Sequence, residues 1–221
     1  MYYPLNLLVE NVEVHPLFGD LLKGEPHVFD FSSNNPKTLE MGTDDFDSFQ
    51  KVVLDELAAN GKSWGVGRYL EERASLLRNY DMMIRDGRVY HAGMDVMVPA
   101  GAEVYAPLAG KVFHVGVEEE LGSYGGHIVL EHQVGESSFY AIYGHLNSDF
   151  LVSEGQILAP GELFARIGER RDSGGWFTHT HLQIITQEAC RRGRMFHGYV
   201  TAEDLKQIEN LFPSPYLLFR V

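Results

Sequence analysis

The stretch T-H-T-H-L-Q-I-I-T, residues 178–186, is the most informative segment of the chain. Its β-branched residues favour an extended backbone, and alternate side chains of a strand point to the same face. His179, His181 and Gln183 therefore share one face. On a helix the two imidazoles would point about 200° apart, because each residue turns the helix by roughly 100°. The pattern predicts a strand that presents two histidines side by side.

Short β-type runs separated by glycine and proline precede this strand from about residue 88. Many short strands at close spacing are typical of an all-β sandwich or barrel. The sequence thus predicts a mainly β domain over residues 88–190. The expected strands are Met94–Val98, Val104–Ala106, Lys111–Val117, His127–Glu131, Phe139–Tyr143, Gln156–Leu158 and Leu163–Ile167.

The sequence predicts that residues 1–87 form an N-terminal flank of α/β character with one or two helices. A helix is expected at about 44–59, where apolar residues recur at helical spacing before an Asn-Gly pair. A second helix is expected over 69–80, where the apolar spacing is similar. The capping groups and N-terminal negative charge of the first helix are expected from Thr43, Asp44 and Asp45.

Residues 191–221 predict a short C-terminal helix and a tail packed on the β domain. Thr201 and Asp204 have the spacing of a capping box, and Pro213 ends the apolar pattern that follows. The sequence contains no long-period repeat and no low-complexity linker. We therefore expect one β domain with a flank on each side.

Charge and composition exclude several classes of partner. The 221 residues carry a formal net charge of −13, which argues against a nucleic-acid partner because phosphate would be repelled. A single cysteine, Cys190, rules out an internal disulfide and suits a reducing compartment. The first residues lack the pattern of a signal peptide, and no run approaches the ~18 apolar residues of a membrane span. These features predict a cytoplasmic protein without a membrane partner, and they leave its oligomeric state open.

The motif H-A-G-M-D, residues 91–95, places a histidine four residues before an aspartate. Along a straight strand His91 and Asp95 would lie roughly 13 Å apart, too far for both side chains to meet one ion. Gly93 permits a bend that would bring imidazole and carboxylate together. A third motif, Y-G-H-L, places His145 just beyond the end of a predicted strand, where it can project into a cleft.

These residues have the composition of a catalytic zinc site. Such a site needs three protein ligands and an open position for water, with bonds of ~2.0–2.2 Å. His91, Asp95 and one histidine of the 179/181 pair supply three ligands, and two histidines then remain for proton transfer. Spacing alone does not choose between His179 and His181. Structural or surface roles are expected for His15, His27, His114, His127, His132 and His197.

Four ordered segments between about residues 88 and 187 carry a family resemblance. In chain order they are HAGMD, VPAGAEVYAPLAGKV, YGHL and HTHLQI. Together they resemble the lysostaphin-type zinc endopeptidases, the family that includes the LytM endopeptidases. The resemblance implies a barrel-sandwich hybrid, or duplicated hybrid motif, built on two antiparallel sheets. It further implies that His91, Asp95 and His181 bind one Zn²⁺ and that His145 and His179 are an unligated catalytic pair.

The activity implied by the resemblance is that of a zinc-dependent metalloendopeptidase, a hydrolase that cleaves a peptide bond with zinc-activated water. Its expected substrate is a peptidoglycan-type or other glycine- or small-residue peptide, although the acidic chain is poorly matched to an anionic cell wall. The alternative is a catalytically silent or occluded peptide-binding domain of the same fold. The run APLAGKVFHV also resembles lipoyl and biotinyl carriers and sugar-phosphotransferase domains. A carrier would need a lysine at an exposed hairpin tip, and a phosphocarrier would not need Asp95 beside its histidines.

Overall fold

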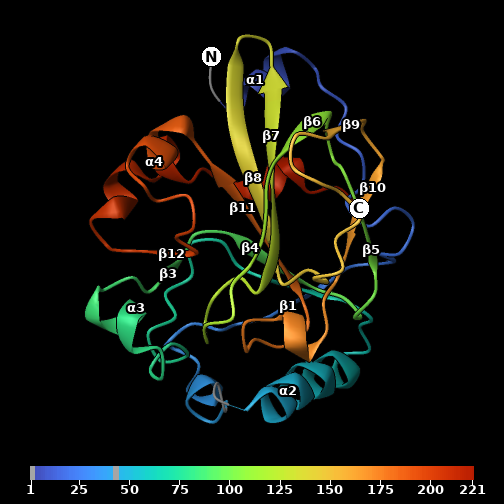
Figure 1. Ribbon diagram of the computed structural model, residues 1–221. Coiled ribbons are helices and arrows are strands. Elements are labelled where there is room, and N and C mark those ends of the chain that lie inside the picture. The colour runs from blue at the N-terminus through green and yellow to red at the C-terminus, as the bar shows by residue number, and fades with distance from the viewer. Residues whose placement is uncertain (1–2, 42–44) are drawn as a thin grey trace.

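The computed structural model describes residues 3–41 and 45–221 and confirms the mainly β prediction (Figure 1). Its main sheet has eight strands in the order β1-β2-β4-β11-β8-β7-β6-β9. These strands are β1 (His27–Val28), β2 (Gly65–Gly67), β4 (Met94–Met97), β6 (Gly110–Val117), β7 (Gly126–Val134), β8 (Ser137–Gly144), β9 (Ile157–Leu158) and β11 (Thr180–Ile185).

Two further sheets each have two strands, so the sheets are divided differently from the expected pair. They pair β5 (Glu103–Tyr105) with β10 (Leu163–Arg166), and β3 (Tyr90–His91) with β12 (Tyr199–Val200). Both pairings are antiparallel, whereas β1 and β2 pair in parallel within the main sheet. The flank thus adds strands to the sheet that contains the histidine strand.

Of the two helices predicted in the flank, the structure confirms the one expected at about 44–59. Helix α2 (Phe46–Ala59) lies within the predicted range and is capped by Asp45, whose side chain accepts a hydrogen bond from the backbone N–H of Asp47. The proposed capping residues Thr43 and Asp44 lie outside the described residues. The other helices are α1 (Leu5–Val9), α3 (Asp81–Arg85), α4 (Gln187–Arg191) and α5 (Ile208–Leu211), with 3₁₀ turns at Pro36–Leu39, Arg170–Asp172, Asp204–Gln207 and Pro215–Leu218.

The helix predicted over 69–80 is wrong, because this segment forms turns at 69–70 and 74–79 with an extended stretch between them. Its backbone pairs with residues 89–90, which precede β4. Arg73 N–H donates to the Val89 carbonyl, and Glu72 forms a β-bridge with Tyr90. Long-range pairing therefore overrides the local apolar spacing. The C-terminal helix is also divided, into a 3₁₀ turn and α5, although Thr201 and Asp204 do exchange capping hydrogen bonds.

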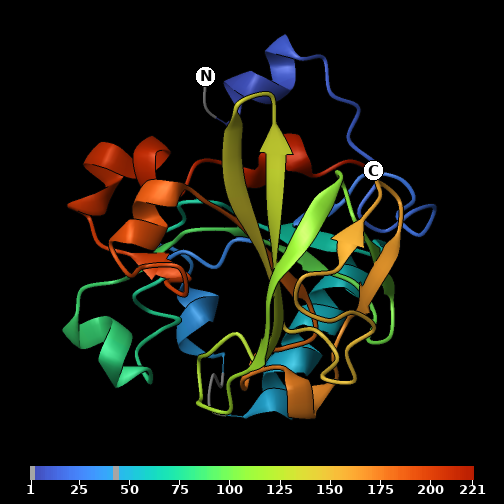
Figure 2. The ribbon, with the colours of Figure 1, turned by 45° about the horizontal axis from the view of Figure 1, so that its top comes forward.

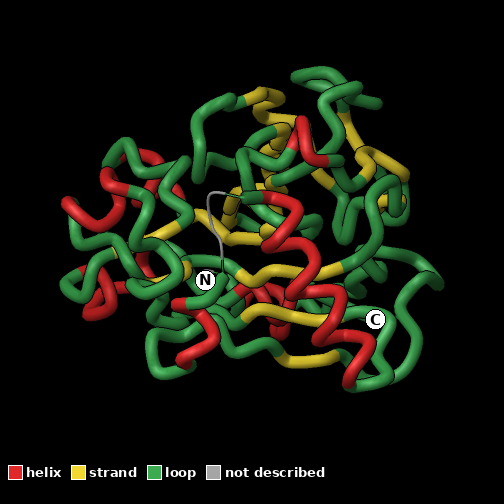
Figure 3. The backbone as a smooth tube through the Cα atoms, turned by 90° about the horizontal axis from the view of Figure 1, so that it is seen from below, coloured by secondary structure: helices red, strands yellow, loops and turns green. Residues whose placement is uncertain are grey.

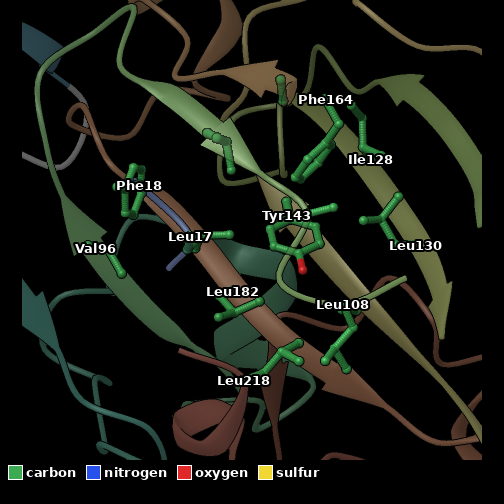
Figure 4. Close-up of a cluster of buried hydrophobic side chains, with 14 of the residues drawn as sticks. Leu17, Phe18, Val96, Leu108, Ile128, Leu130, Tyr143, Phe164, Leu182 and Leu218 are labelled. Carbon is green, nitrogen blue, oxygen red and sulfur yellow. The ribbon is translucent and has the colours of Figure 1, made fainter. Parts of the chain in front are cut away.

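The largest core fills the space between the main sheet and the β5–β10 pair (Figure 4). Tyr143 of β8 lies at its centre and packs edge-on against Phe164 of β10, with ring centroids 5.0 Å apart. At the far end of the β7–β8 hairpin, Tyr3 packs on Phe139 beside α1 (Figure 2). Among the described residues, no helix is long and apolar enough to cross a membrane.

A second core lies under α2, which crosses the bottom of the molecule (Figure 3). Phe49 is fully buried there and packs against Phe177, with ring centroids 4.7 Å apart. We expect Phe49→Ala to lower the free energy of unfolding by about 3–5 kcal/mol, because a large cavity would remain. Leu54→Ala on the exposed side of the same helix is the control. Equal urea midpoints for the two variants would contradict this assignment of the core.

Candidate metal centre

The register of three neighbouring strands gathers the predicted site residues. Asp95 of β4 lies directly opposite His181 of β11, and His181 lies opposite Gly144, the last residue of β8. His145 directly follows Gly144, so its side chain leaves the backbone beside β11. His91 ends β3, and the chain bends at residues 92–93 before β4 begins. The expected bend between His91 and Asp95 is therefore present.

Gly93 has a second role that spacing did not reveal. A Cβ atom at this position would lie 2.6 Å from His181 Nε2 and 2.6 Å from the Leu182 carbonyl oxygen. Both separations are far below van der Waals contact, so any side chain would displace the His181 ring. The glycine thus provides the room that lets β11 approach the bend.

Three ligand atoms converge at the centre of the site. His91 Nε2 lies 2.9 Å from His181 Nδ1 and 3.1 Å from Asp95 Oδ1, and His181 Nδ1 lies 3.4 Å from the same oxygen. Ligands on a tetrahedral zinc ion with bonds of ~2.0–2.2 Å are separated by about 3.3–3.6 Å. A small adjustment of the rings would place all three at bonding distance from one ion.

The other nitrogen of each ring is already used as a hydrogen-bond donor. His91 Nδ1–H donates to the Arg68 carbonyl at 2.9 Å, and His181 Nε2–H donates to Gln183 Oε1 at 2.9 Å. In the neutral rings, His91 Nε2 and His181 Nδ1 consequently carry lone pairs that face each other and a carboxylate. A cation between these groups would relieve the repulsion, and orientation of a ligand ring through its far nitrogen is common in metal sites.

Burial and neighbouring charges give this group the protonation state that zinc requires. Burial, together with the Arg73 charge, lowers the pKa of His91 to about 3. Burial alone would raise the pKa of Asp95, but its interactions with His91 and with the Arg73 guanidinium outweigh burial and hold that pKa well below its usual range. At neutral pH the site therefore offers an unprotonated His91 and an ionised carboxylate.

His145 and His179 lie together beside the three ligand atoms, with ring centroids 4.3 Å apart. His179 Nδ1–H donates to the Phe177 carbonyl at 2.7 Å, and its Nε2 lies 3.4 Å from Asp95 Oδ1. His145 has a left-handed backbone with φ of 59°, and its buried Nδ1 has no hydrogen-bond partner among the described residues. Burial and the nearby His179 lower the pKa of His145 well below its usual value.

A cavity of about 140 Å³ adjoins these five residues. Aromatic side chains form much of its wall, and Glu118 and Glu120 add negative charge. The five site residues are each no more than 5% exposed. The lining includes His91, Asp95, His145, His179, His181, Tyr124, Trp176, Phe177, Phe196 and Tyr199, and it includes none of the six histidines expected to be structural or superficial.

Gln183 holds His181 in place, a role that the sequence did not assign although it put both residues on one strand face. Its Nε2 donates to the His197 carbonyl at 3.1 Å, and its Oε1 also accepts from the Tyr124 hydroxyl at 3.2 Å. These contacts fix the orientation of the amide. The oxygen therefore faces His181, whose lone pair is directed toward His91.

Comparison with known proteins shows which class of protein this site resembles. Residues 89–192 match the model of Peptidase family M23, so this segment is similar to that peptidase family. The match includes His91, Asp95 and His181 together with His145 and His179. The N-terminal flank and the C-terminal turns lie outside it.

The matching relatives cover the chain only in part. The uncharacterized lipoprotein YgeR of Escherichia coli (strain K12) is 36% identical over 76 residues, which are 34% of this chain and 28% of that protein. The chain thus spans less than a third of that relative's length. A zinc-containing peptidase from Vibrio cholerae is 29% identical over 45% of this chain and 28% of that one, with a TM-score of 0.35. The catalytic domain of lysostaphin from Staphylococcus simulans is 20% identical, and the match covers 55% of this chain and 80% of that domain, with a TM-score of 0.40.

Proposed function

We propose that the protein is a zinc metalloendopeptidase that holds one Zn²⁺ through His91 Nε2, Asp95 Oδ1 and His181 Nδ1. The observation that carries this proposal is the convergence of these three atoms within 2.9–3.4 Å of one another. The similarity of residues 89–192 to a peptidase family supports it. Three protein ligands with an open fourth position are the usual arrangement of a catalytic zinc site.

A bound zinc ion would supply Lewis acidity, which polarises a peptide carbonyl and makes water a stronger nucleophile. His179 is placed to accept a proton at Nε2, because its Nδ1–H is fixed on the Phe177 carbonyl. His145 Nδ1 has no described partner, so it can bind the substrate or stabilise negative charge that develops on it. The five site residues are each no more than 5% exposed, so little water contacts these groups.

The substrate we propose is a peptidoglycan-type or other glycine- or small-residue peptide. The cavity of about 140 Å³ is close to the ~150 Å³ that accommodates benzene. This small volume supports a preference for small residues next to the scissile bond. The cytoplasmic location expected from the sequence stays a prediction.

Zinc content and peptide turnover test the proposal together. We expect about one zinc per chain after mild dialysis, and hydrolysis of glycine-rich peptides in preference to peptides with aromatic residues. Removal of zinc with a chelator should abolish turnover, and added zinc should restore it. Protein that binds no zinc would contradict the metal centre. Protein that binds zinc but cleaves no member of a peptide library would favour the silent peptide-binding domain, which the small cavity also accommodates.

A further inference from the structure

Arg73 is a buried cation that contacts the metal centre from outside the family-matched segment. Its side chain is 3% exposed, and Nη1 donates to Asp95 Oδ2 at 2.8 Å. Nε donates to Glu71 Oε2 at 2.9 Å, so the guanidinium lies between two buried carboxylates. Both residues precede residue 89, where the family match begins. Burial of such charges is costly, and their retention calls for a specific role.

The contact determines which oxygen of Asp95 is available to a metal. Because Oδ2 is bound to Arg73, only Oδ1 faces His91 and His181, at 3.1 and 3.4 Å. A carboxylate free on both oxygens could rotate or bind an ion through both. Arg73 thus favours one orientation and one-oxygen coordination.

The neighbouring strand is shaped to permit this contact. Gly67 of β2 lies opposite Asp95 of β4. A Cβ atom at Gly67 would lie 2.8 Å from Asp95 Oδ2 and 2.9 Å from Arg73 Nη2. Any larger residue would therefore separate the guanidinium from the carboxylate. The flank thus provides both the guanidinium, at Arg73, and the space beside Asp95, at Gly67.

Glu71 anchors Arg73 beside Asp95. Its side chain is 3% exposed, and its second oxygen accepts from the Phe31 backbone N–H at 3.2 Å. The same oxygen lies 3.6 Å from Arg68 Nη1. These contacts fix the carboxylate that accepts from Arg73 Nε, so the two flank residues together orient the metal ligand.

We propose that Arg73 is a positioning residue for the metal ligand Asp95, supported by Glu71, and that residues 65–73 are a structural part of the metal centre. The inference rests on the metal site of the proposed function but not on peptide cleavage. It assigns a role to a segment that contributes no ligand atom of its own.

The test compares Arg73→Met/Glu71→Gln with Arg73→Lys/Glu71→Gln and with the wild-type chain. The common Glu71→Gln change avoids leaving a buried carboxylate without its partner. Zinc affinity is measured by competition with a chromophoric chelator, and the visible spectrum is recorded after Co²⁺ substitution. We expect the methionine variant to bind zinc 10–100-fold more weakly, the usual effect of losing a partner that orients a ligand. Its Co²⁺ spectrum should change because Asp95 Oδ2 is freed, and the lysine variant should recover part of both.

Arg78→Met is the matched control, because Arg78 follows residues 65–73 in the flank and donates to the backbone carbonyls of Thr38, Leu39, Ser75 and Met41 rather than to Asp95. Its loss should lower stability without changing the Co²⁺ spectrum. A folded Arg73→Met/Glu71→Gln protein with wild-type zinc affinity and spectrum would overturn the inference. Wild-type protein that binds zinc without cleaving peptides would refute only the proposed activity, whereas wild-type protein that binds no metal would refute both.

Discussion

His181→Ala is expected to lose zinc and peptide turnover together. The substitution removes Nδ1, one of three ligand atoms that lie within 2.9–3.4 Å of one another, and leaves His91 and Asp95 as the only protein ligands. Loss of a partner that merely orients a ligand costs roughly 10–100-fold in metal affinity. Loss of the ligand itself should exceed that range. Titration with a zinc-selective chelator and a parallel turnover assay would measure both effects.

The matched control for His181→Ala is His132→Ala. His132 is also a fully buried histidine, but its Nδ1–H donates to the Ala109 carbonyl and its ring does not line the cavity. This variant should be less stable than the wild type and still bind one zinc. Zinc retained by the His181 variant with full affinity would show that the three atoms do not form the metal site.

Most strands could be predicted because their signals are local. Glycine and proline separate the apolar runs, and the seven expected strands from Met94 to Ile167 are all observed with ends displaced by a few residues. The histidine strand is shorter than its motif, since β11 begins at Thr180. His179 therefore precedes the strand, and its ring is fixed by the Phe177 carbonyl rather than by strand alternation.

The parts of the site that sequence reasoning missed depend on contacts distant in the chain. Arg73 lies 22 residues from Asp95, in a segment whose leucines and tyrosine have helical spacing. Leu76, Leu77 and Tyr80 are buried, but they lie in turns that pack under α2. Glu71 and Arg73 stand two apart in an extended stretch, so they can face the same neighbour. Only the pairing of this stretch with residues 89–91 directs them to the metal centre.

The assignment of different roles to His179 and His181 likewise depends on the three-dimensional structure. The two residues differ in which nitrogen is free: His181 directs Nδ1 toward His91 because Gln183 holds Nε2, whereas His179 directs Nε2 toward Asp95 because Phe177 holds Nδ1. Spacing along a strand contains neither fact. The geometry groups His91, Asp95 and His181 as possible ligands, and the catalytic roles stay a proposal.

His179→Ala is expected to keep its zinc and lose peptide turnover by about 10²–10⁴-fold, the range for deletion of a positioned general acid or base. The substitution leaves all three ligand atoms in place and removes only an imidazole whose Nε2 lies 3.4 Å from Asp95 Oδ1. His145→Ala should have the same effect, because the two rings lie 4.3 Å apart in one cavity. Their double variant should lose less than the product of the single effects if both act in one step.

Zinc content, thermal unfolding and turnover measured on the same preparations would separate this prediction from a general loss of structure. His197→Ala is the control, because His197 contacts Gln183 through its backbone carbonyl and its ring does not line the cavity. It should keep both zinc and activity. Zinc lost from the His179 variant but kept by the His181 variant would reverse the assigned roles. Full turnover in both the His179 and the His145 variants would exclude proton transfer by this pair and leave the chemistry to the metal centre alone.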